Sequence, residues 1–381
     1  MTALHVAVVG KGLIGSAAAR HLAEAGCEVT LIGPDEPADY RSHGGVFAAH
    51  YDPARITRIM DRDPLWAGWA AASISRYPAL EAATGMKFHH PVGFLAAAGE
   101  GSDLLPAMEA SARAFGMQPL TDARHPFRLP PGTATRFESA PGGYIDARRC
   151  VQAQTIAAVA AGAKVVRLPV WALRSENGVV RAILDDGSEV RADQVLVCAG
   201  AFSAVVGLAP GMPLQADGRV VLLARVEDDL AERFAAMPSL IRVDAAADLA
   251  DVYLLPPVRY PDGKRYIKIG TGAIRHPLDD LESLQCWYRD GAVGDDAARL
   301  AQAMFDLLPE LEGAELRTDL CAVTTTPSGY PIIDWSKPGR IAVACGGNGK
   351  AAKSSDEIGR IAALLVTDQL DDPGLAAELR A

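Results

Sequence analysis

A glycine-rich turn between two apolar strands constrains the fold of this chain more than any other feature. The apolar run Val6 to Val9 leads directly into Gly10-Lys11-Gly12-Leu13-Ile14-Gly15, and residues Ser16 to Ala25 have helical composition. A second apolar strand, Glu28 to Ile32, follows at once. Strand, turn, helix and strand in this order form one βαβ unit, which predicts a buried parallel sheet with helices packed on it.

Each glycine of this turn has a distinct physical task. Gly10 permits the tight turn, Gly12 lets the backbone approach a pyrophosphate, and Gly15 lets helix and strand pack closely. The pyrophosphate would lie on the unpaired N–H groups at the start of the helix, beside Leu13 and Ile14. A glycine turn that binds nothing is the alternative, but the order of the elements favours a dinucleotide site.

The acidic residue that usually takes the ribose hydroxyls of a dinucleotide is displaced in this sequence. It is expected at the end of the second strand, about 20 residues beyond the glycines, where Gly33 stands. Asp35 and Glu36 follow in the loop, and either acid would reach the ribose; the alternative is that both are solvated loop charges. We take Glu36 as the predicted ribose ligand.

Strand and turn patterns recur farther along the chain. The strand Gln194 to Val197 ends in Cys198-Ala199-Gly200, and Asp185-Asp186-Gly187-Ser188 predicts a hairpin turn between two β-prone runs. Another apolar strand, Arg340 to Ala344, runs into a glycine loop and then a helical stretch, Ser354 to Leu370.

The segments between these patterns predict a second structural unit. Residues 89–142 are rich in proline and glycine, and residues 219–275 contain β-prone runs such as Val220 to Leu223, which indicate a mostly antiparallel sheet. We therefore expect a discontinuous nucleotide-binding domain interrupted twice by a substrate domain. The expected nucleotide-binding parts are residues 1–88, 143–218 and 317–381, and the substrate domain comprises residues 89–142 and 219–316.

Length, charge and cysteine usage narrow the class of protein. A chain of 381 residues is long enough for two hydrophobic cores. Its 37 Lys and Arg residues against 47 Asp and Glu residues give a net charge of −10, which opposes nucleic acid binding. No apolar run approaches the roughly 18 residues of a membrane span, and no secretory signal opens the chain. The six cysteines form no CxxC pair, so we expect a cytoplasmic protein with reduced thiols, no metal site and no membrane partner.

Two C-terminal motifs point to a known family. They are Cys321-Ala322-Val323-Thr324-Thr325-Thr326-Pro327-Ser328-Gly329-Tyr330-Pro331-Ile332-Ile333-Asp334 and Gly346-Gly347-Asn348-Gly349-Lys350-Ala351-Ala352-Lys353. With the N-terminal glycine unit and the strand that ends at Gly200, they make the chain similar to the FAD-dependent D-amino acid oxidase superfamily, in the branch of monomeric sarcosine, N-methyltryptophan and glycine oxidases. The resemblance implies an α/β fold: a discontinuous Rossmann-like FAD-binding domain, with helices on a parallel sheet, plus a substrate domain on a mostly antiparallel sheet.

The same resemblance implies which residues hold FAD. In sarcosine oxidases the cysteine that matches Cys321 is bonded to the flavin ring, so a thioether at Cys321 is expected; the alternative is a small buried thiol. The glycine loop after the C-terminal strand would face the pyrimidine end of the flavin, where a helix N-terminus suits negative charge. The further FAD-binding residues that the resemblance implies are Ser42, His43, Val166, Gly200, Gly346, Gly347, Asn348 and Gly349.

Four other residues are implied in catalysis and substrate binding. Lys268 resembles the lysine that activates dioxygen beside the flavin, although a lysine among strand-formers would otherwise point to solvent. Arg58 and Lys353 match residues that hold the substrate carboxylate, and Tyr253 matches a tyrosine of the substrate pocket. Gly272 replaces a histidine of the relatives, so a more open pocket and a bulkier substrate are expected.

These inferences together predict an FAD-dependent oxidase that cleaves the C–N bond of an amino acid by hydride transfer to the flavin and releases hydrogen peroxide. The expected substrate is an N-substituted glycine, and the resemblance favours an N-carboxymethyl amine or β-amino acid. The partners of this oxidase would be the small amine substrate and dioxygen, and the protein would be a monomer or a homodimer. Two alternatives use the same N-terminal unit. A nicotinamide-dependent dehydrogenase would leave Cys321 and the second glycine loop unexplained, and a flavin-binding protein without turnover would have no need for Lys268.

Overall fold

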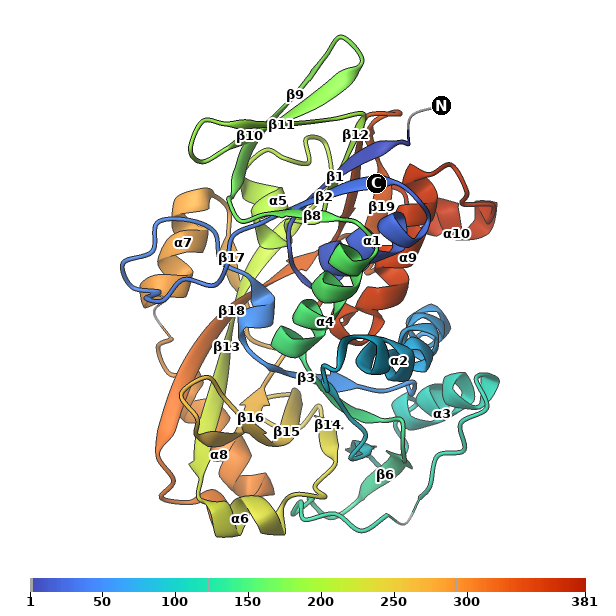
Figure 1. Ribbon diagram of the computed structural model, residues 1–381. Coiled ribbons are helices and arrows are strands. Elements are labelled where there is room, and N and C mark those ends of the chain that lie inside the picture. The colour runs from blue at the N-terminus through green and yellow to red at the C-terminus, as the bar shows by residue number, and fades with distance from the viewer. Residues whose placement is uncertain (1–2, 122, 292) are drawn as a thin grey trace.

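The chain folds around a six-stranded sheet that contains the predicted βαβ unit. The computed structural model describes residues 3–121, 123–291 and 293–381, and Figure 1 shows their arrangement. The strand order is β19-β20-β12-β1-β2-β8, and all neighbours pair in parallel except β19 with β20. The strands are β1 (His5–Val9), β2 (Glu28–Ile32), β8 (Lys164–Val166), β12 (Gln194–Val197), β19 (Ile332–Lys337) and β20 (Ile341–Cys345).

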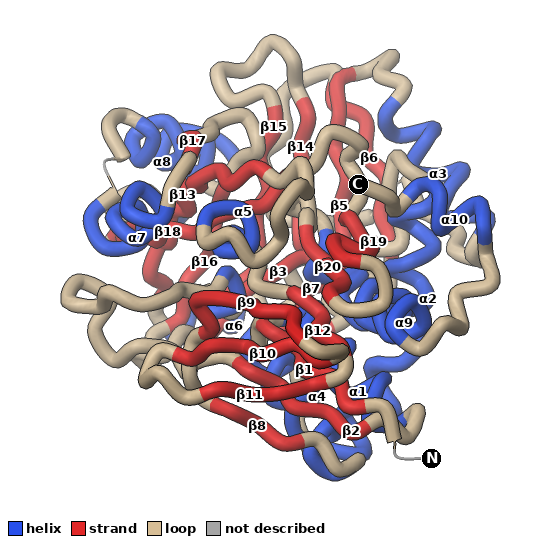
Figure 2. The backbone as a smooth tube through the Cα atoms, turned by 90° about the horizontal axis from the view of Figure 1, so that it is seen from above, coloured by secondary structure: helices blue, strands red, loops and turns tan. Residues whose placement is uncertain are grey.

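Different layers cover the two faces of this sheet, because successive side chains of a strand point to opposite sides. Val6 and Val8 of β1 share a core with three helices and with Trp66 and Trp69, whereas Ala7 and Val9 pack against a small antiparallel sheet. Figure 2 shows that small sheet beside the strands of the parallel sheet. The helices are α1 (Leu13–Glu24), α4 (Ala147–Ala160) and α9 (Ser355–Val366), and the small sheet holds β9 (Val170–Glu176), β10 (Val179–Leu184) and β11 (Glu189–Ala192).

A second large sheet of eight strands forms the other half of the molecule, with the order β17-β13-β16-β15-β14-β5-β6 and β18 paired with β13. Its pairs are antiparallel except β14 with β5. This sheet confirms the mostly antiparallel sheet expected from the sequence. The strands are β5 (Phe94–Gly99), β6 (Thr133–Glu138), β13 (Gln215–Val226), β14 (Ser239–Val243), β15 (Asp251–Arg259), β16 (Arg265–Gly270), β17 (His276–Leu278) and β18 (Leu316–Thr325).

The long strand β13 separates two environments. Val220, Leu222 and Ala224 pack into a core with α7 (Leu281–Asp290) and α8 (Asp296–Leu307), while Leu223 packs on the opposite side. The division into two domains stays a prediction. The sequence places a domain boundary between residues 316 and 317, which is where strand β18 begins. This strand pairs with β13 along its length, so it belongs to the antiparallel sheet and not to the parallel one.

Short elements complete the fold. A second small sheet has the order β3-β7-β4. Among the described helices, none is both long and apolar enough to cross a membrane. The remaining elements are η1 (Ala49–Tyr51), β3 (Ala54–Thr57), α2 (Pro64–Thr84), β4 (His89–His90), α3 (Leu104–Ala114), β7 (Gly143–Asp146), α5 (Ala201–Val205), α6 (Asp228–Arg233), η2 (Pro309–Leu311), η3 (Ala351–Ser354) and α10 (Pro373–Glu378).

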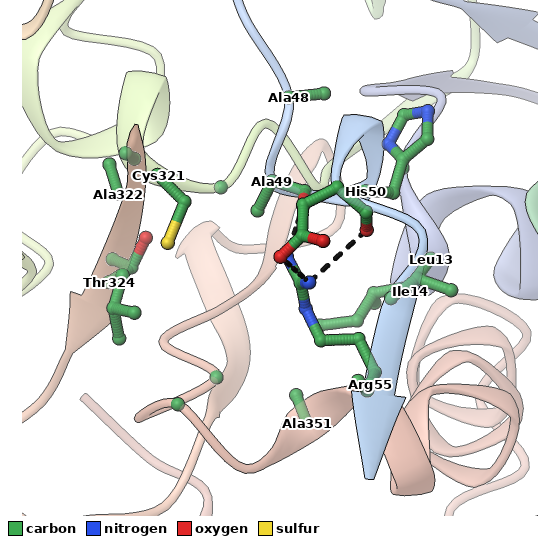
Figure 3. Close-up of a pocket in the computed structure, with 18 of the residues that line it drawn as sticks. Leu13, Ile14, Ala48, Ala49, His50, Arg55, Cys321, Ala322, Thr324 and Ala351 are labelled. Atoms are coloured by element: carbon green, nitrogen blue, oxygen red, sulfur yellow. Dashed lines mark hydrogen bonds and ion pairs between the residues drawn. The ribbon is translucent and has the colours of Figure 1, made fainter. Parts of the chain in front are cut away.

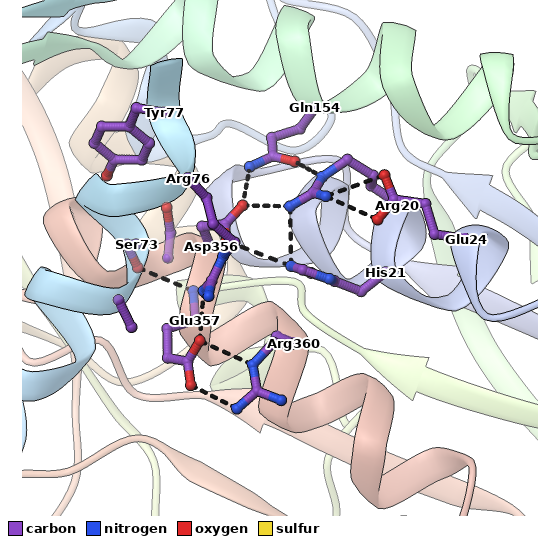
Figure 4. Close-up of polar contacts among 12 residues, drawn as sticks. Arg20, His21, Glu24, Ser73, Arg76, Tyr77, Gln154, Asp356, Glu357 and Arg360 are labelled. Carbon is purple, nitrogen blue, oxygen red and sulfur yellow. Dashed lines mark hydrogen bonds and ion pairs between the residues drawn. The ribbon is translucent and has the colours of Figure 1, made fainter. Parts of the chain in front are cut away.

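A buried polar network joins four helices behind the parallel sheet (Figure 4). Asp356, at the start of α9, accepts hydrogen bonds from Arg20 of α1 (2.6 Å), Gln154 of α4 (2.7 Å) and Arg76 of α2. The adjacent Glu357 pairs with Arg76 as well. Burial alone would raise the pKa of Asp356, but its hydrogen-bonded neighbours hold that pKa well below its ordinary value. The network therefore fixes α1 and α9 relative to each other.

Candidate active site

A cavity of about 550 Å³ opens where the carboxyl ends of β1, β2, β12 and β20 meet the antiparallel sheet. Open parallel sheets bind ligands outside the carboxyl ends of their strands, and ligand pockets are typically of this size. Figure 3 shows the central part of the cavity, with Arg55 on one wall and Cys321 on the other. The expected FAD-binding and substrate residues can be placed against this cavity.

The N-terminal glycine turn has the geometry that its sequence predicts. Gly10 has a φ of +112°, and a Cβ there would lie 2.3 Å from the carbonyl oxygen of Cys198. A Cβ at Gly15 would lie 1.8 Å from the carbonyl oxygen of Gly10, so only glycine permits this contact of helix and strand. Gly12 is the N-cap of α1, and a Cβ there would meet nothing closer than 3.9 Å. Gly12, Leu13 and Ile14 line the cavity beside free helical N–H groups.

His50, rather than the predicted pair Ser42 and His43, faces the glycine turn. Its Nδ1 atom is buried without a hydrogen-bond partner among the described residues, and burial lowers the pKa of the ring to about 3. Ser42 donates to Asp39 and His43 contacts the carbonyl of Val46, both outside the lining of the cavity. A buried ring nitrogen without a partner beside a glycine turn is an open position for a ligand atom.

The predicted ribose ligand lies away from the cavity wall. Glu36 accepts from Tyr40 (2.7 Å) and pairs with Arg148, and the other acid, Asp35, pairs with Arg167 and Lys11. At the strand end, a Cβ on Gly33 would lie 2.7 Å from the backbone nitrogen of Lys11, so an acidic side chain does not fit there. Gly33 itself lines the cavity.

Of the remaining predicted FAD-binding residues, five line the cavity and one lies within the parallel sheet. Gly200, Gly346, Gly347, Asn348 and Gly349 all line the cavity. The predicted position Val166 instead ends strand β8, where its carbonyl accepts a hydrogen bond from the N–H of Gly33 (2.9 Å).

The C-terminal glycine loop is held by its own side chains. Asn348 accepts from the backbone N–H of Thr326 (3.0 Å) and donates to the carbonyl of Gly346 (2.6 Å). A Cβ at Gly346, whose φ is +87°, would lie 2.3 Å from the methyl group of Thr326. The loop is thereby locked to the segment after β18, and it leads into η3, whose first residues line the cavity.

Strand register brings three predicted residues to one face of the antiparallel sheet. Leu223 of β13 pairs with Lys268 of β16, and Tyr253 of β15 pairs with Gly270, two residues beyond Lys268. Cys321 of β18 pairs with Arg219 of β13, which is four residues before Leu223. Residues directly opposite in an antiparallel pair share a face, as do residues two or four apart in one strand. Lys268, Tyr253 and Cys321 therefore all line the cavity.

Lys268 is buried in an ion pair that sequence analysis did not identify. Its Nζ lies 2.7 Å from Asp52 Oδ2 and also donates to the carbonyl of Ala54. Asp52 in addition pairs with Arg55 and accepts from the hydroxyl of Tyr260 (2.9 Å). Burial lowers the pKa of Lys268 to about 8, while its neighbours hold the pKa of Asp52 below its ordinary value. The alternative of a solvent-facing lysine is thus wrong, because Lys268 is 1% exposed.

Cys321 points its sulfur into the cavity (Figure 3). Its carbonyl accepts from the indole N–H of Trp287 (2.9 Å), which fixes the strand at this position. Burial raises the pKa of the thiol, although Arg55 opposes this shift. The thiol is accessible from the cavity, as a bond to a ligand there requires.

Arg58 and Lys353 converge, as predicted, but on an acidic residue of the chain itself. Arg58 Nη1 lies 2.8 Å and Lys353 Nζ 3.2 Å from the same oxygen of Asp61. Burial lowers the pKa of Lys353 to about 8, whereas the two cations hold the pKa of Asp61 below its ordinary value. The buried carboxylate of Glu138 accepts from the N–H groups of Ile59 (2.8 Å) and Met60 (2.6 Å), so it fixes the segment between Arg58 and Asp61.

The space beside Gly272 is occupied rather than open. The carboxylate of Asp251 accepts from the N–H of Gly272 (2.9 Å), and a Cβ on Gly272 would lie 2.9 Å from the same oxygen. Asp251 lines the cavity together with Tyr253 and Thr271. The missing histidine is therefore replaced by an acidic side chain from the neighbouring strand.

The family of the chain follows from its sequence. Residues 5–365 match the family described as FAD dependent oxidoreductase (DAO), so the chain belongs to this family of flavoenzymes and its cofactor is FAD. The residues present fit that cofactor, because the glycine turn, the free Nδ1 of His50 and the second glycine loop line one cavity. The cofactor is thus FAD and not the nicotinamide dinucleotide that the alternative of a dehydrogenase would use.

Solved structures show the same fold. NikD, an unusual amino acid oxidase essential for nikkomycin biosynthesis, is 19% identical over 99% of this chain and 97% of its own, with a TM-score of 0.75. A mutant of Amadoriase I from Aspergillus fumigatus is 19% identical over 100% and 90% of the two chains, with a TM-score of 0.75. Glycine oxidase from Geobacillus kaustophilus is 20% identical over 99% and 98%, with a TM-score of 0.70. No curated protein matches the chain by sequence.

Proposed function

We propose that this flavoenzyme oxidises the C–N bond of an amino acid, an N-substituted glycine, with dioxygen as electron acceptor. The observation that carries the proposal is the convergence of Arg58 and Lys353 on one wall of the flavin cavity. They come from distant parts of the chain and are both buried. Two buried cations at one point form a carboxylate site, and a guanidinium adds the bidentate geometry that suits a carboxylate.

Asp61 prepares this site in the absence of substrate. It neutralises part of the positive charge, so the two cations are held in place without being left unpaired. A substrate carboxylate would share them with Asp61, and the net charge of the cluster of Arg58, Lys353 and Asp61 would change from +1 to zero. The site thus favours a single carboxylate and disfavours a neutral amide.

The chemistry divides between cofactor and protein. Bound FAD would supply the redox chemistry, namely acceptance of a hydride from the carbon beside the amine nitrogen and transfer of two electrons to dioxygen, which with two protons gives hydrogen peroxide. The protein orients the substrate through Arg58 and Lys353, with Tyr253 closing the pocket. Because the lone pair of the neutral amine assists the loss of hydride, no side-chain base is needed, and Lys268 supplies the positive charge that favours oxygen reduction.

The proposed activity is tested by anaerobic mixing with secondary amino acids. N-alkyl glycines should bleach the flavin absorbance without oxygen, and readmitted oxygen should restore it with one peroxide per turnover. Flavin that no amino acid reduces would instead support the alternative of a flavin-binding protein without turnover.

Substitutions at the carboxylate site give the first prediction. Arg58→Ala and Lys353→Ala should each lower kcat/KM for a carboxylate substrate by about 30-fold or more relative to kcat/KM for its amide. The reason is that loss of one partner of a desolvated charge pair costs about 2–5 kcal/mol. The measurement is kcat/KM for matched acid and amide substrates.

The half-exposed Lys350, 3.9 Å from Asp61, gives the matched control. Lys350→Ala should leave the acid-to-amide ratio nearly unchanged. If the two buried variants kept the wild-type ratio as well, the carboxylate would bind elsewhere.

Covalent attachment of FAD at Cys321 gives the second prediction. Acid-precipitated protein should stay yellow, and its intact mass should exceed that of the polypeptide by one FAD. Cys321→Ala should release the colour into the supernatant, whereas Cys286→Ala, at an exposed cysteine outside the cavity, should not. Complete release of colour from the wild-type protein would contradict the bond while leaving FAD binding intact.

A further inference from the structure

The cavity wall carries more positive charge than its acidic residues balance. Most of the cationic side chains that line the cavity form ion pairs with one of three acids. Asp35 pairs with Lys11, and Asp52 pairs with Arg55 and Lys268. Asp61 pairs with Arg58, Lys350 and Lys353. Two lining arginines, Arg219 and Arg275, have no ion-pair partner among the described residues. This leaves an uncompensated positive region in a cavity that holds the substrate.

Arg219 is the buried member of this region. It lies on β13, 8% exposed, on the same face as Cys321. Its Nη1 donates to the carbonyls of Gly272 (3.1 Å) and Ile274. These carbonyls carry no formal charge, and buried arginines are normally paired with an anion. The other nitrogens of the guanidinium make no hydrogen bond to the described residues.

The nearby acidic and basic groups do not supply the missing anion. Asp217 lies two residues earlier on the same face of β13 but is outside ion-pair distance of Arg219, and Asp251 is hydrogen-bonded to Gly272 and Thr271. Arg275 adds a second positive charge. After burial, its repulsion is the next cause that lowers the pKa of Arg219. The charge of Asp217 acts in the opposite direction, but only from beyond ion-pair distance. Two neighbouring cations without a carboxylate in ion-pair contact favour an anion from outside the protein.

We propose that Arg219, assisted by Arg275, binds a second carboxylate of the substrate and so selects a dianionic secondary amine. The inference rests on the proposed function, in which Arg58 and Lys353 hold the first carboxylate. The substrate class is then an N-carboxymethyl amino acid, with the amine nitrogen between two carboxylates. A guanidinium with free nitrogens offers the second carboxylate a bidentate contact, and the exposed Arg275 adds charge at the mouth of the cavity.

Unreactive ligands test this assignment in the flavin-loaded enzyme. Thioether analogues replace the amine nitrogen with sulfur: methylthioacetate has one carboxylate, whereas thiodiacetate and 3-(carboxymethylthio)propionate have two at different spacings. Binding is measured from the change in flavin absorbance. The wild-type enzyme should bind at least one dicarboxylate more tightly than methylthioacetate.

Arg219→Met should lower the affinity for the preferred dicarboxylate by about 100-fold, while the affinity for methylthioacetate should change by no more than about threefold. Arg219→Lys should recover part of the loss, since it restores charge without the bidentate geometry. Arg275→Met, at an exposed position, provides a second variant that should leave the fold intact, with a smaller loss for the same ligand. Arg299→Met, at an exposed ion pair outside the cavity, is the matched control.

The outcomes separate this inference from the proposed function. Equal weakening of mono- and dicarboxylates in Arg219→Met would assign Arg219 to anchoring the loop of Gly272 and Ile274, and would overturn the second carboxylate site. Equal affinity of the wild-type enzyme for all three ligands would do the same. Reduction of the flavin by N-methylglycine would keep the proposed function in either case, whereas failure of every secondary amino acid to reduce it would remove both.

Discussion

Replacing Lys268 by methionine is expected to slow the reaction of the reduced enzyme with oxygen by about 100-fold or more, while reduction by substrate stays within about tenfold of wild type. The substitution keeps the length and apolar stem of the side chain and removes the charge that Asp52 holds in the cavity wall. Stopped-flow absorbance measures the two half-reactions separately. Equal losses in both would make Lys268 a structural residue.

The pH dependence of the oxygen reaction provides an independent readout. Burial lowers the pKa of Lys268 to about 8, so the lysine is charged below that pH and becomes neutral above it. The rate of reoxidation should therefore fall as the pH rises through about 8, and Lys268→Met should remove this dependence. Lys264→Met, in the exposed turn before β16, is the matched control and should retain both the rate and the pH profile.

Asp356→Asn should strongly destabilise the fold, lowering the free energy of unfolding by about 3–5 kcal/mol. An amide would place N–H donors against Arg20, Arg76 and Gln154, leaving buried positive charge without a carboxylate. Chemical denaturation measures the effect. Asp248→Asn, which removes an exposed pair with Arg299, should cost less than about 1 kcal/mol.

The sign of the pH dependence follows from the lowered pKa of Asp356. A carboxyl group whose pKa is lower in the folded state stabilises the protein above its unfolded pKa, near 4, and loses this contribution as the pH falls. The difference between wild type and Asp356→Asn should thus be constant near neutral pH and shrink below about pH 4. A difference that grew on acidification would contradict the role of the charged carboxylate.

Local patterns in the sequence predicted the parts of the fold that local interactions determine. The βαβ unit was predictable because the close contacts of Gly10 and Gly15 exclude every side chain. The hairpin between β10 and β11 was predictable from its Asp-Gly turn. The resemblance to a family supplied the expected positions of Lys268, Cys321 and Lys353 around one cavity, which no local pattern could place together.

The acidic partners in the site could not be predicted in this way. Asp52 and Asp61 lie in loops on either side of β3, and only the packing of distant strands brings them to Lys268 and Lys353. The short Ser42-His43 match was not specific enough to distinguish His43 from His50, seven residues later. In the sequence, Arg219 looks like an ordinary strand residue. Its lack of an ion-pair partner depends on the positions of many side chains, which the sequence does not give.

The shared strand β13 limits how the sequence of this enzyme can vary in length. It pairs with β18 at Cys321 and with β16 at Lys268, so one register sets the direction of residues from three strands. Insertion of a single residue between Arg219 and Leu223 would reverse the side-chain directions in one part of the strand. Either Arg219 or Leu223, which pairs with Lys268, would then point to the face that packs on α7 and α8. Two inserted residues would restore the direction but shift the spacing along the cavity. Evolution of new substrate preferences is therefore easier by exchange of side chains on this strand than by change in its length.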